Sequence, residues 1–118
     1  MSPWVWDPHA GGTPISATVQ EETRARIVAA AQRRGLKSVF RLEIRFKGSF
    51  CYIDAYEPDS PLPTHLCRLR YFCARGPKAW SLAFYTYSNE NYEPCVFPSG
   101  EEFGTPEEGF EVGSMYLS

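Results

Sequence analysis

Positions 40 to 56 carry the pattern that most constrains the fold, an alternation of apolar and polar residues. Apolar side chains occupy every second position from Phe40 to Phe46, and charged residues stand between them. A second alternating run extends from Cys51 to Tyr56, shortly after Gly48. A period of two matches the pleat of a strand with one buried and one exposed face. The sequence therefore predicts an antiparallel hairpin that turns near Gly48.

Three further segments continue this pattern. Residues 65–73 predict a third strand and residues 80–87 a fourth, with a turn at Gly76-Pro77 between them. Residues 92–97 are a candidate edge strand, because Pro94 cannot donate to a strand ladder. We therefore expect a four-stranded antiparallel meander, or a five-stranded one if the last segment pairs.

A helix is predicted before the sheet. Thr18 and Glu21 have the spacing of a capping box, and a narrow apolar stripe runs from Val19 to Ala31. Gly35 is well placed as the left-handed residue after the helix. Together these signals predict a helix over about residues 19–34, packed on the apolar face of the sheet.

A second, short helix is predicted near the end of the sequence. Thr105 is the expected N-cap, Pro106 the first helical residue and Glu108 the partner in a capping box. Three apolar residues are its expected anchors: Phe110, Met115 and Leu117. The fold class is therefore α+β, with an N-terminal helix on an antiparallel sheet and a short C-terminal helix.

The length of 118 residues indicates one domain, which we place at residues 16–118. Residues 1–15 have no periodicity and are expected to form an extended arm. Trp4 and Trp6 in this arm should contact apolar surface, either on the same domain or on a second subunit in a homodimer.

Composition excludes several classes of protein. No apolar run approaches the roughly 20 residues of a membrane-spanning helix, so we expect a cytoplasmic protein without a membrane partner. The four cysteines fall in or beside strand-like segments, so free thiols are expected, with Cys51, Cys67 and Cys73 as core residues. No phosphate-binding loop, nucleophile elbow or metal-binding motif is present, and no cofactor is expected.

Charge is divided unevenly along the chain. Residues 1–78 hold all 12 Lys and Arg with seven acids, a net charge of +5, whereas residues 79–118 hold seven acids and no basic residue. Either the two parts lie together and neutralise each other, or a basic face awaits an anionic partner. The first explanation is favoured, and it places the acidic segment Glu90–Glu111 near the first helix or the arginines of the sheet.

One face of the predicted sheet, which we call the polar face, gathers the candidate binding residues. Arginine side chains can hold phosphate or carboxylate groups through bidentate contacts, and tyrosine rings can stack on bases. The alternative is a solvated face with cross-strand ion pairs. Nucleic acid is the less favoured ligand because the overall charge is acidic. The candidate ligand-binding residues are Arg41, Arg45, Tyr52, Tyr56, Arg68 and Arg70.

Glu43 and Asp54 are candidate catalytic residues whose relation depends on the hairpin register. A Gly48-Ser49 turn would place them directly opposite each other, as a carboxylate pair suited to acid–base work or metal binding. A Lys47-Gly48 turn would place Arg41 opposite Asp54 instead. This second register is favoured, because it replaces repulsion between two acids with a salt bridge.

His65 completes the candidate catalytic set. Strict alternation places His65 and Cys67 on the same face of one strand, about 6 to 7 Å apart. A thiol–imidazole pair or two metal ligands could result, but the spacing of the other cysteines does not favour a zinc site.

Several runs of the sequence resemble a family of small bacterial proteins known only as uncharacterised. The resemblance extends over roughly residues 15 to 117, and it implies a prokaryotic source but no activity and no functional residue. It rests on segments 50–56, 64–72, 85–90, 92–100 and 104–108.

Two functions remain open from the sequence. The favoured one is a non-enzymatic binding module for an unknown protein partner or a small anionic ligand, with the polar face or the Trp-bearing arm as its contact surface. The alternative is a small hydrolase-like or metal-assisted enzyme that uses Glu43, Asp54 and His65.

Overall fold

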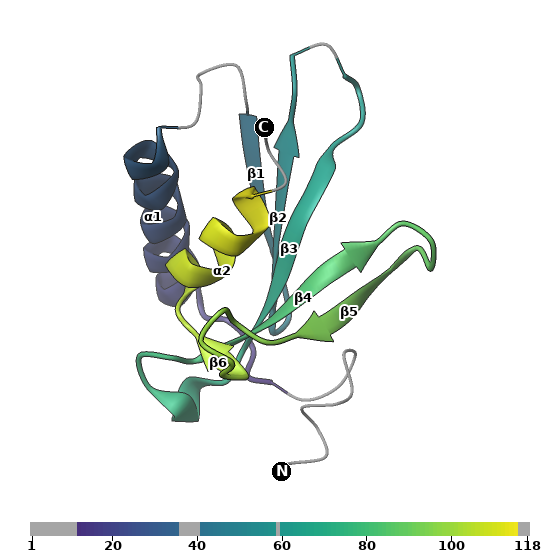
Figure 1. The fold of residues 1–118 in the computed structure, drawn as a ribbon. Coiled ribbons are helices and arrows are strands. Elements are labelled where there is room, and N and C mark those ends of the chain that lie inside the picture. The colour runs from purple at the N-terminus through teal and green to yellow at the C-terminus, as the bar shows by residue number, and fades with distance from the viewer. Residues whose placement is uncertain (1–11, 36–40, 59, 116–118) are drawn as a thin grey trace.

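The computed structural model describes residues 12–35, 41–58 and 60–115. The fold is α+β, as the sequence predicts: a helix, an antiparallel sheet and a second, shorter helix (Figure 1). Residues 1–11 of the predicted arm, including Trp4 and Trp6, lie outside the described residues, whereas Ile15 at its end is buried in the hydrophobic core. The elements are α1 (Ala17–Arg34), β1 (Arg41–Lys47), β2 (Phe50–Tyr56), β3 (Thr64–Tyr71), the 3₁₀ turn η2 (Cys73–Arg75), β4 (Trp80–Thr86), β5 (Asn91–Cys95), β6 (Phe103–Gly104) and α2 (Pro106–Ser114).

Helix α1 begins two residues before the predicted start. Ser16 is the N-cap and its hydroxyl accepts a hydrogen bond from the Val19 amide, so the predicted capping box at Thr18 is wrong. Ser16 is preferred because its extended backbone and short hydroxyl satisfy an amide of the first turn. The C-terminal prediction is confirmed, since Gly35 takes the left-handed conformation with φ 71°.

The strands follow the meander that the sequence predicts. Their order is β1-β2-β3-β4-β5, and the two-residue strand β6, which the sequence did not reveal, pairs with β4 beyond the end of β5. Figure 1 shows both helices on one side of the sheet. The main core lies between them and the sheet and includes Ile27 of α1, Ile53 of β2 and Phe110 of α2, none of which is exposed. The polar face is the opposite side.

The β1–β2 turn has the register that the sequence analysis disfavoured. Glu43 lies directly opposite Asp54, and the two central turn residues are Gly48 and Ser49. Gly48 has φ 59°, which fits the first central position of a type II′ turn. A Lys47-Gly48 turn matching the twist of the strands would force Lys47 to a positive φ, which is costly for a side chain with a Cβ. Turn geometry therefore outweighs repulsion between the two acids.

A β-bulge in β3 overturns the prediction that His65 and Cys67 share a face. Ile53 pairs with Cys67 and Asp54 with His65, so Leu66 is an extra residue on β3. Leu66 and Cys67 are both fully buried in the main core. The extra residue shifts the alternation by one position, which turns His65 toward the polar face.

The end of β3 also differs from the prediction. The strand stops at Tyr71, and Cys73 lies in the turn η2, where it is exposed. Cys73 is therefore not a core residue, because the 3₁₀ turn carries it out of the sheet. Cys51 and Cys67 are buried as expected, and all four cysteines, including Cys95, are free thiols.

Helix α2 has the predicted capping box. Thr105 accepts from the Glu108 amide, and the Glu108 side chain accepts from the Thr105 amide. Of its expected anchors, Phe110 is fully buried, but Met115 is 71% exposed because the helix ends at Ser114; Leu117 lies outside the described residues.

The glycines of α2 bring this helix close to the sheet. A Cβ at Gly113 would lie 2.9 Å from the backbone oxygen of Leu66, and one at Gly109 would lie 2.6 Å from the Leu69 side chain. These residues weaken the isolated helix but allow close packing on β3.

The acidic segment contacts basic residues, as the charge division predicts. Glu107 of α2 pairs with Arg26 of α1 at 2.7 Å, and Glu101 pairs with Lys78 at 3.2 Å. The first pair joins the two helices, so the expected proximity of this segment to α1 is confirmed. Within the described part of the chain, no helix is long and apolar enough to cross a membrane.

Candidate functional site

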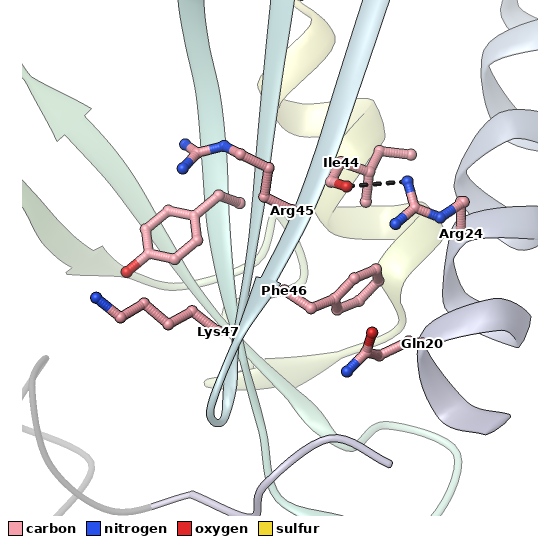
Figure 2. Close-up of a pocket in the computed structure, with 7 residues that line it drawn as sticks. Gln20, Arg24, Ile44, Arg45, Phe46 and Lys47 are labelled. Atoms are coloured by element: carbon pink, nitrogen blue, oxygen red, sulfur yellow. Dashed lines mark hydrogen bonds between the residues drawn. The ribbon is translucent and has the colours of Figure 1, made fainter. Parts of the chain in front are cut away.

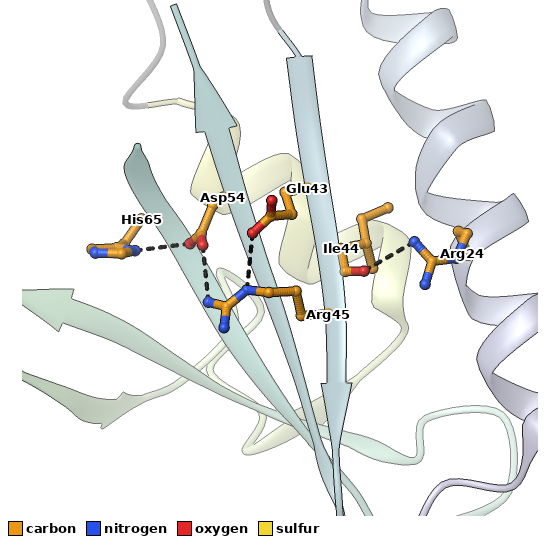
Figure 3. A network of polar contacts seen from close by, with 6 residues as sticks. All are labelled: Arg24, Glu43, Ile44, Arg45, Asp54 and His65. Carbon is orange, nitrogen blue, oxygen red and sulfur yellow. Dashed lines mark hydrogen bonds and ion pairs between the residues drawn. The ribbon is translucent and has the colours of Figure 1, made fainter. Parts of the chain in front are cut away.

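Four polar side chains form a connected network on the polar face (Figure 3). Arg45 of β1 contacts two carboxylates, with its Nε 3.2 Å from Glu43 Oε1 and its Nη2 3.0 Å from Asp54 Oδ2. His65 Nδ1 lies 2.8 Å from the other oxygen of Asp54. The hairpin register and the β3 bulge together position these groups, which we call the Arg45 network.

Asp54 is the buried centre of this network. It is 2% exposed, and each of its oxygens receives one charged or polar partner. A carboxylate only accepts hydrogen bonds, so the Nδ1 of neutral His65 carries the proton and Nε2 is left as an acceptor. Burial lowers the pKa of Arg45, but the hydrogen bond and charge of Asp54, together with Glu43, outweigh it and raise that pKa. Arg45 therefore stays a cation.

Aromatic rings surround His65. Its ring centroid lies 4.6 Å from that of Tyr85 and 6.2 Å from those of Tyr87 and Tyr92. Tyr92 is 9% exposed, and no hydrogen bond within the described structure reaches its hydroxyl. Burial, with the negative charge of Asp54, raises the pKa of Tyr92, so this phenol is neutral.

The predicted binding arginines all pack on aromatic rings. Arg41 lies over the Tyr56 ring at 4.4 Å, and Arg45 lies over the Tyr52 ring at 5.1 Å. Each ring belongs to the residue directly opposite its arginine in the β1–β2 pair. Such contacts hold the guanidinium groups in place while leaving their edges able to donate.

The two arginines of β3 are in a different environment. Arg68 is 5% exposed and lies over Phe50 at 4.3 Å, and Arg70 is 4% exposed and lies over Phe72 at 5.1 Å. Burial lowers the pKa of Arg68, while the nearby Tyr52 and Tyr92 oppose that effect. A role of Arg68 and Arg70 in binding an external anion stays a prediction.

A groove at the outer side of β1 adds residues that the sequence did not single out (Figure 2). It has a volume of about 760 Å³, within the usual size range of ligand sites. We call it the edge groove. Its lining residues are Gln20, Arg24, Ile44, Arg45, Phe46, Lys47 and Tyr52.

The cations of the edge groove come from two elements. Arg24 of α1 donates to the Ile44 carbonyl at 2.9 Å and lies 5.3 Å from the Phe46 ring centroid. Lys47 is exposed at the end of β1, and Arg45 is held by its ion pairs with Glu43 and Asp54. Among the residues that the structure describes, no acidic side chain lines the groove. The arrangement suits a negatively charged ligand, because three cations gather there and the guanidinium of Arg45 is already ordered by its two carboxylate partners.

Sequence reasoning found Arg45 and Tyr52 of this groove but missed the residues that α1 contributes. Gln20 and Arg24 are four residues apart, so they project from the same side of a helix. The sequence does not indicate which strand that side approaches.

The three candidate catalytic residues belong to one network, but they are not equivalent. Asp54 and His65 are in direct contact, whereas Arg45 bridges Glu43 to Asp54. Among the described residues, no cluster of three His, Cys, Asp or Glu side chains is placed to hold a metal ion.

Comparison with protein-family models, curated proteins and solved structures found no match to this chain. The resemblance to a family of uncharacterised bacterial proteins therefore stays a prediction.

Proposed function

We propose that this protein is a non-enzymatic binding module that takes an anionic ligand in the edge groove. One observation carries the proposal: Arg24, Arg45 and Lys47 line a single open groove from two elements, and no acid of the described part of the chain lines it. Coulomb attraction and charge-assisted hydrogen bonds would favour carboxylate or phosphate groups there.

The contacts of Glu43 and Asp54 with Arg45 also support binding over catalysis. Both carboxylates contact the guanidinium of Arg45, which offsets the repulsion between them and occupies them within the network. Arg45 keeps an exposed side chain, 50% accessible, that can contact a ligand from the groove.

The proposal is tested by titrating isotope-labelled protein with citrate and with inorganic phosphate at low ionic strength, while backbone amide signals are recorded. Signals of residues 20–24 and 44–47 should shift in a saturable way. Lys47→Gln and Arg24→Gln should each weaken binding about tenfold, the worth of one charge-assisted hydrogen bond.

The matched control is Lys78→Gln. Lys78 is also an exposed cation, but it pairs with Glu101 and does not line the groove. If Lys78→Gln weakens binding as much as Lys47→Gln, the anion is attracted by overall charge and the proposed site is wrong. An absence of saturable shifts with both anions would also refute it.

A second candidate function is an enzyme in which His65 acts as a general base. The contact between His65 and the buried Asp54 favours it, because a base oriented by a carboxylate is a recurring catalytic arrangement. Glu43 would then only position Arg45. Turnover of nitrophenyl acetate or nitrophenyl phosphate that disappears in His65→Gln would support this function, and turnover unchanged in that variant would exclude it.

A further inference from the structure

The outer side of β1 is an open edge of the sheet. β1 is the first strand in the order β1-β2-β3-β4-β5, and no other described strand pairs with its outer side. An open edge offers backbone N–H and C=O groups to another extended chain.

The turn geometry identifies which backbone groups face outward. Lys47 and Phe50 flank a two-residue turn, so they form a hydrogen-bonded pair, and such pairs alternate along an antiparallel ladder. The alternate positions on β1 therefore direct their backbone groups away from β2: Leu42, Ile44 and Phe46. Arg24 supports this assignment independently, because it reaches the Ile44 carbonyl from outside the sheet. No described residue accepts a hydrogen bond from the amides of these three positions on the outer side.

The two faces of β1 differ in chemistry. Arg41, Arg45 and Lys47 project on the polar face, where Glu43 is the single acid of the strand. Leu42, Ile44 and Phe46 project toward the helices and pack on the core, Leu42 and Phe46 only partly buried. A strand added beside β1 would meet cations on one face and apolar surface on the other.

We propose that the edge groove receives an extended acidic peptide, which adds to the sheet antiparallel to β1. This inference rests on the proposed function and names its ligand class: a peptide segment with apolar residues at every second position, acidic residues opposite Arg41, Arg45 and Lys47, and a neutral polar residue opposite Glu43. The acids would face Arg41, Arg45 and Lys47, and the apolar side chains would face Leu42 and Phe46.

Arg24 has a defined role in this mode of binding. Its hydrogen bond protects the Ile44 carbonyl while the groove is empty, which limits unwanted pairing at the edge. An incoming strand would take over that carbonyl, and the released guanidinium of Arg24 could then pair with a carboxylate of the peptide.

The test uses the blocked peptide Ac-Glu-Val-Glu-Val-Thr-Val-Glu-NH₂ and isotope-labelled protein; its glutamates lie opposite Lys47, Arg45 and Arg41, and its threonine lies opposite Glu43. Binding should slow hydrogen exchange at the amides of Leu42, Ile44 and Phe46. Two methylated peptides of equal charge are then compared. In an antiparallel pair the residues opposite these three positions lie on the apolar face, so the valine amides form the backbone bonds. N-methylation at the valines should weaken binding about tenfold or more relative to N-methylation at the glutamates.

Several outcomes would overturn the inference. If the valine-methylated peptide binds as tightly as the glutamate-methylated one, the backbone is not used. If citrate binds as proposed above and the peptide does not, the proposed function stands and this inference fails. If neither binds, both fail. Protection of the same amides by concentration-dependent dimerisation, without peptide, would identify a second copy of this chain as the occupant.

A charge variant provides a further check on the same peptide. Lys47→Glu changes an exposed side chain beside the turn and should leave the fold intact. This variant should bind the acidic peptide about tenfold more weakly than the parent protein does, and it should bind the corresponding peptide with lysine in place of glutamate more tightly. Equal binding of both peptides by this variant would contradict the proposed charge pairing.

Discussion

His65 lies against Asp54, with 2.8 Å between Nδ1 and Oδ1, although strict alternation would place these two side chains on opposite faces of the sheet. The extra residue Leu66 in β3 brings them together. The carboxylate of Asp54 also holds Arg45, which lines the edge groove. The bulge thus connects an aromatic cluster on the polar face to the groove that we propose as the binding site.

Removing the centre of this network should destabilise the protein. Asp54→Ala deletes the acceptor of both Arg45 and His65 at a buried position, so we expect a loss of about 2 to 3 kcal/mol in the free energy of unfolding. Glu43→Ala is the matched control, because Glu43 is partly exposed and, within the described residues, pairs with Arg45 alone; its effect should stay within about 1 kcal/mol. Urea denaturation of the two variants measures both values. Equal effects would mean that Asp54 is not the centre of the network.

The cysteines should differ sharply in reactivity. Burial raises the pKa of Cys51 to about 12 and that of Cys67 well above its ordinary value, whereas Cys73 is exposed. A thiol reagent at pH 8 should therefore modify Cys73 first in the native protein, and Cys51 and Cys67 only after unfolding. Without reductant, the count in denaturant should be four. A count of two would reveal a disulfide and contradict the free thiols described above.

Two substitutions in α2 distinguish close packing from helix propensity. Alanine is the better helix former by about 1 kcal/mol, so helix propensity alone predicts that either glycine-to-alanine substitution stabilises the protein. Gly113→Ala should destabilise the protein by about 1 to 3 kcal/mol, because its Cβ would meet the backbone oxygen of Leu66 at 2.9 Å. Gly109→Ala should cost less, since the Leu69 side chain that it meets can rotate. Thermal unfolding of both variants measures which one is less stable. A Gly113→Ala protein more stable than the parent would refute the close approach of α2 to the Leu66 backbone.

The ion pair between the helices should give a pH-dependent part of the stability. Burial raises the pKa of Glu107, but the hydrogen bond and charge of Arg26 outweigh it, and the pKa is lowered from its ordinary value of 4.5. A lowered pKa in the folded state stabilises the protein above the unfolded-state value, and the contribution is lost as the pH falls through the folded-state value. The Arg26–Glu107 pair is partly exposed, so we expect about 0.5 kcal/mol. Comparing Glu107→Gln with the parent protein at pH 7 and pH 3 measures it, and a difference that persists unchanged at pH 3 would contradict this origin.

Local sequence signals predicted the elements that depend on nearby residues. The capping box at Thr105 and Glu108 begins α2, and Gly35 ends α1, because each motif satisfies backbone groups within a few residues. Alternation identified four strands and the helix-facing side of β1 for the same reason. The start of α1 was misplaced because Ser16 and Thr18 both carry a suitable hydroxyl, and only their backbone conformation distinguishes them.

The candidate site depended on relations that span the chain. Asp54, His65 and Arg45 were recognisable as polar positions, but their contact depends on pairing between strands. The Gly48-Ser49 turn moves the partner of Asp54 by two positions, from Arg41 to Glu43, relative to the alternative turn, and the Leu66 bulge shifts the alternation of β3 by one residue. The edge groove depended on the packing of α1 beside β1, which brings Arg24 to the Ile44 carbonyl across 20 positions of sequence. Most elements and the two faces of the β1–β2 hairpin were thus determined by the sequence through local backbone preferences and burial. The tertiary structure alone decided which face His65 takes and which charged side chains meet, because both depend on how separate elements pair and pack.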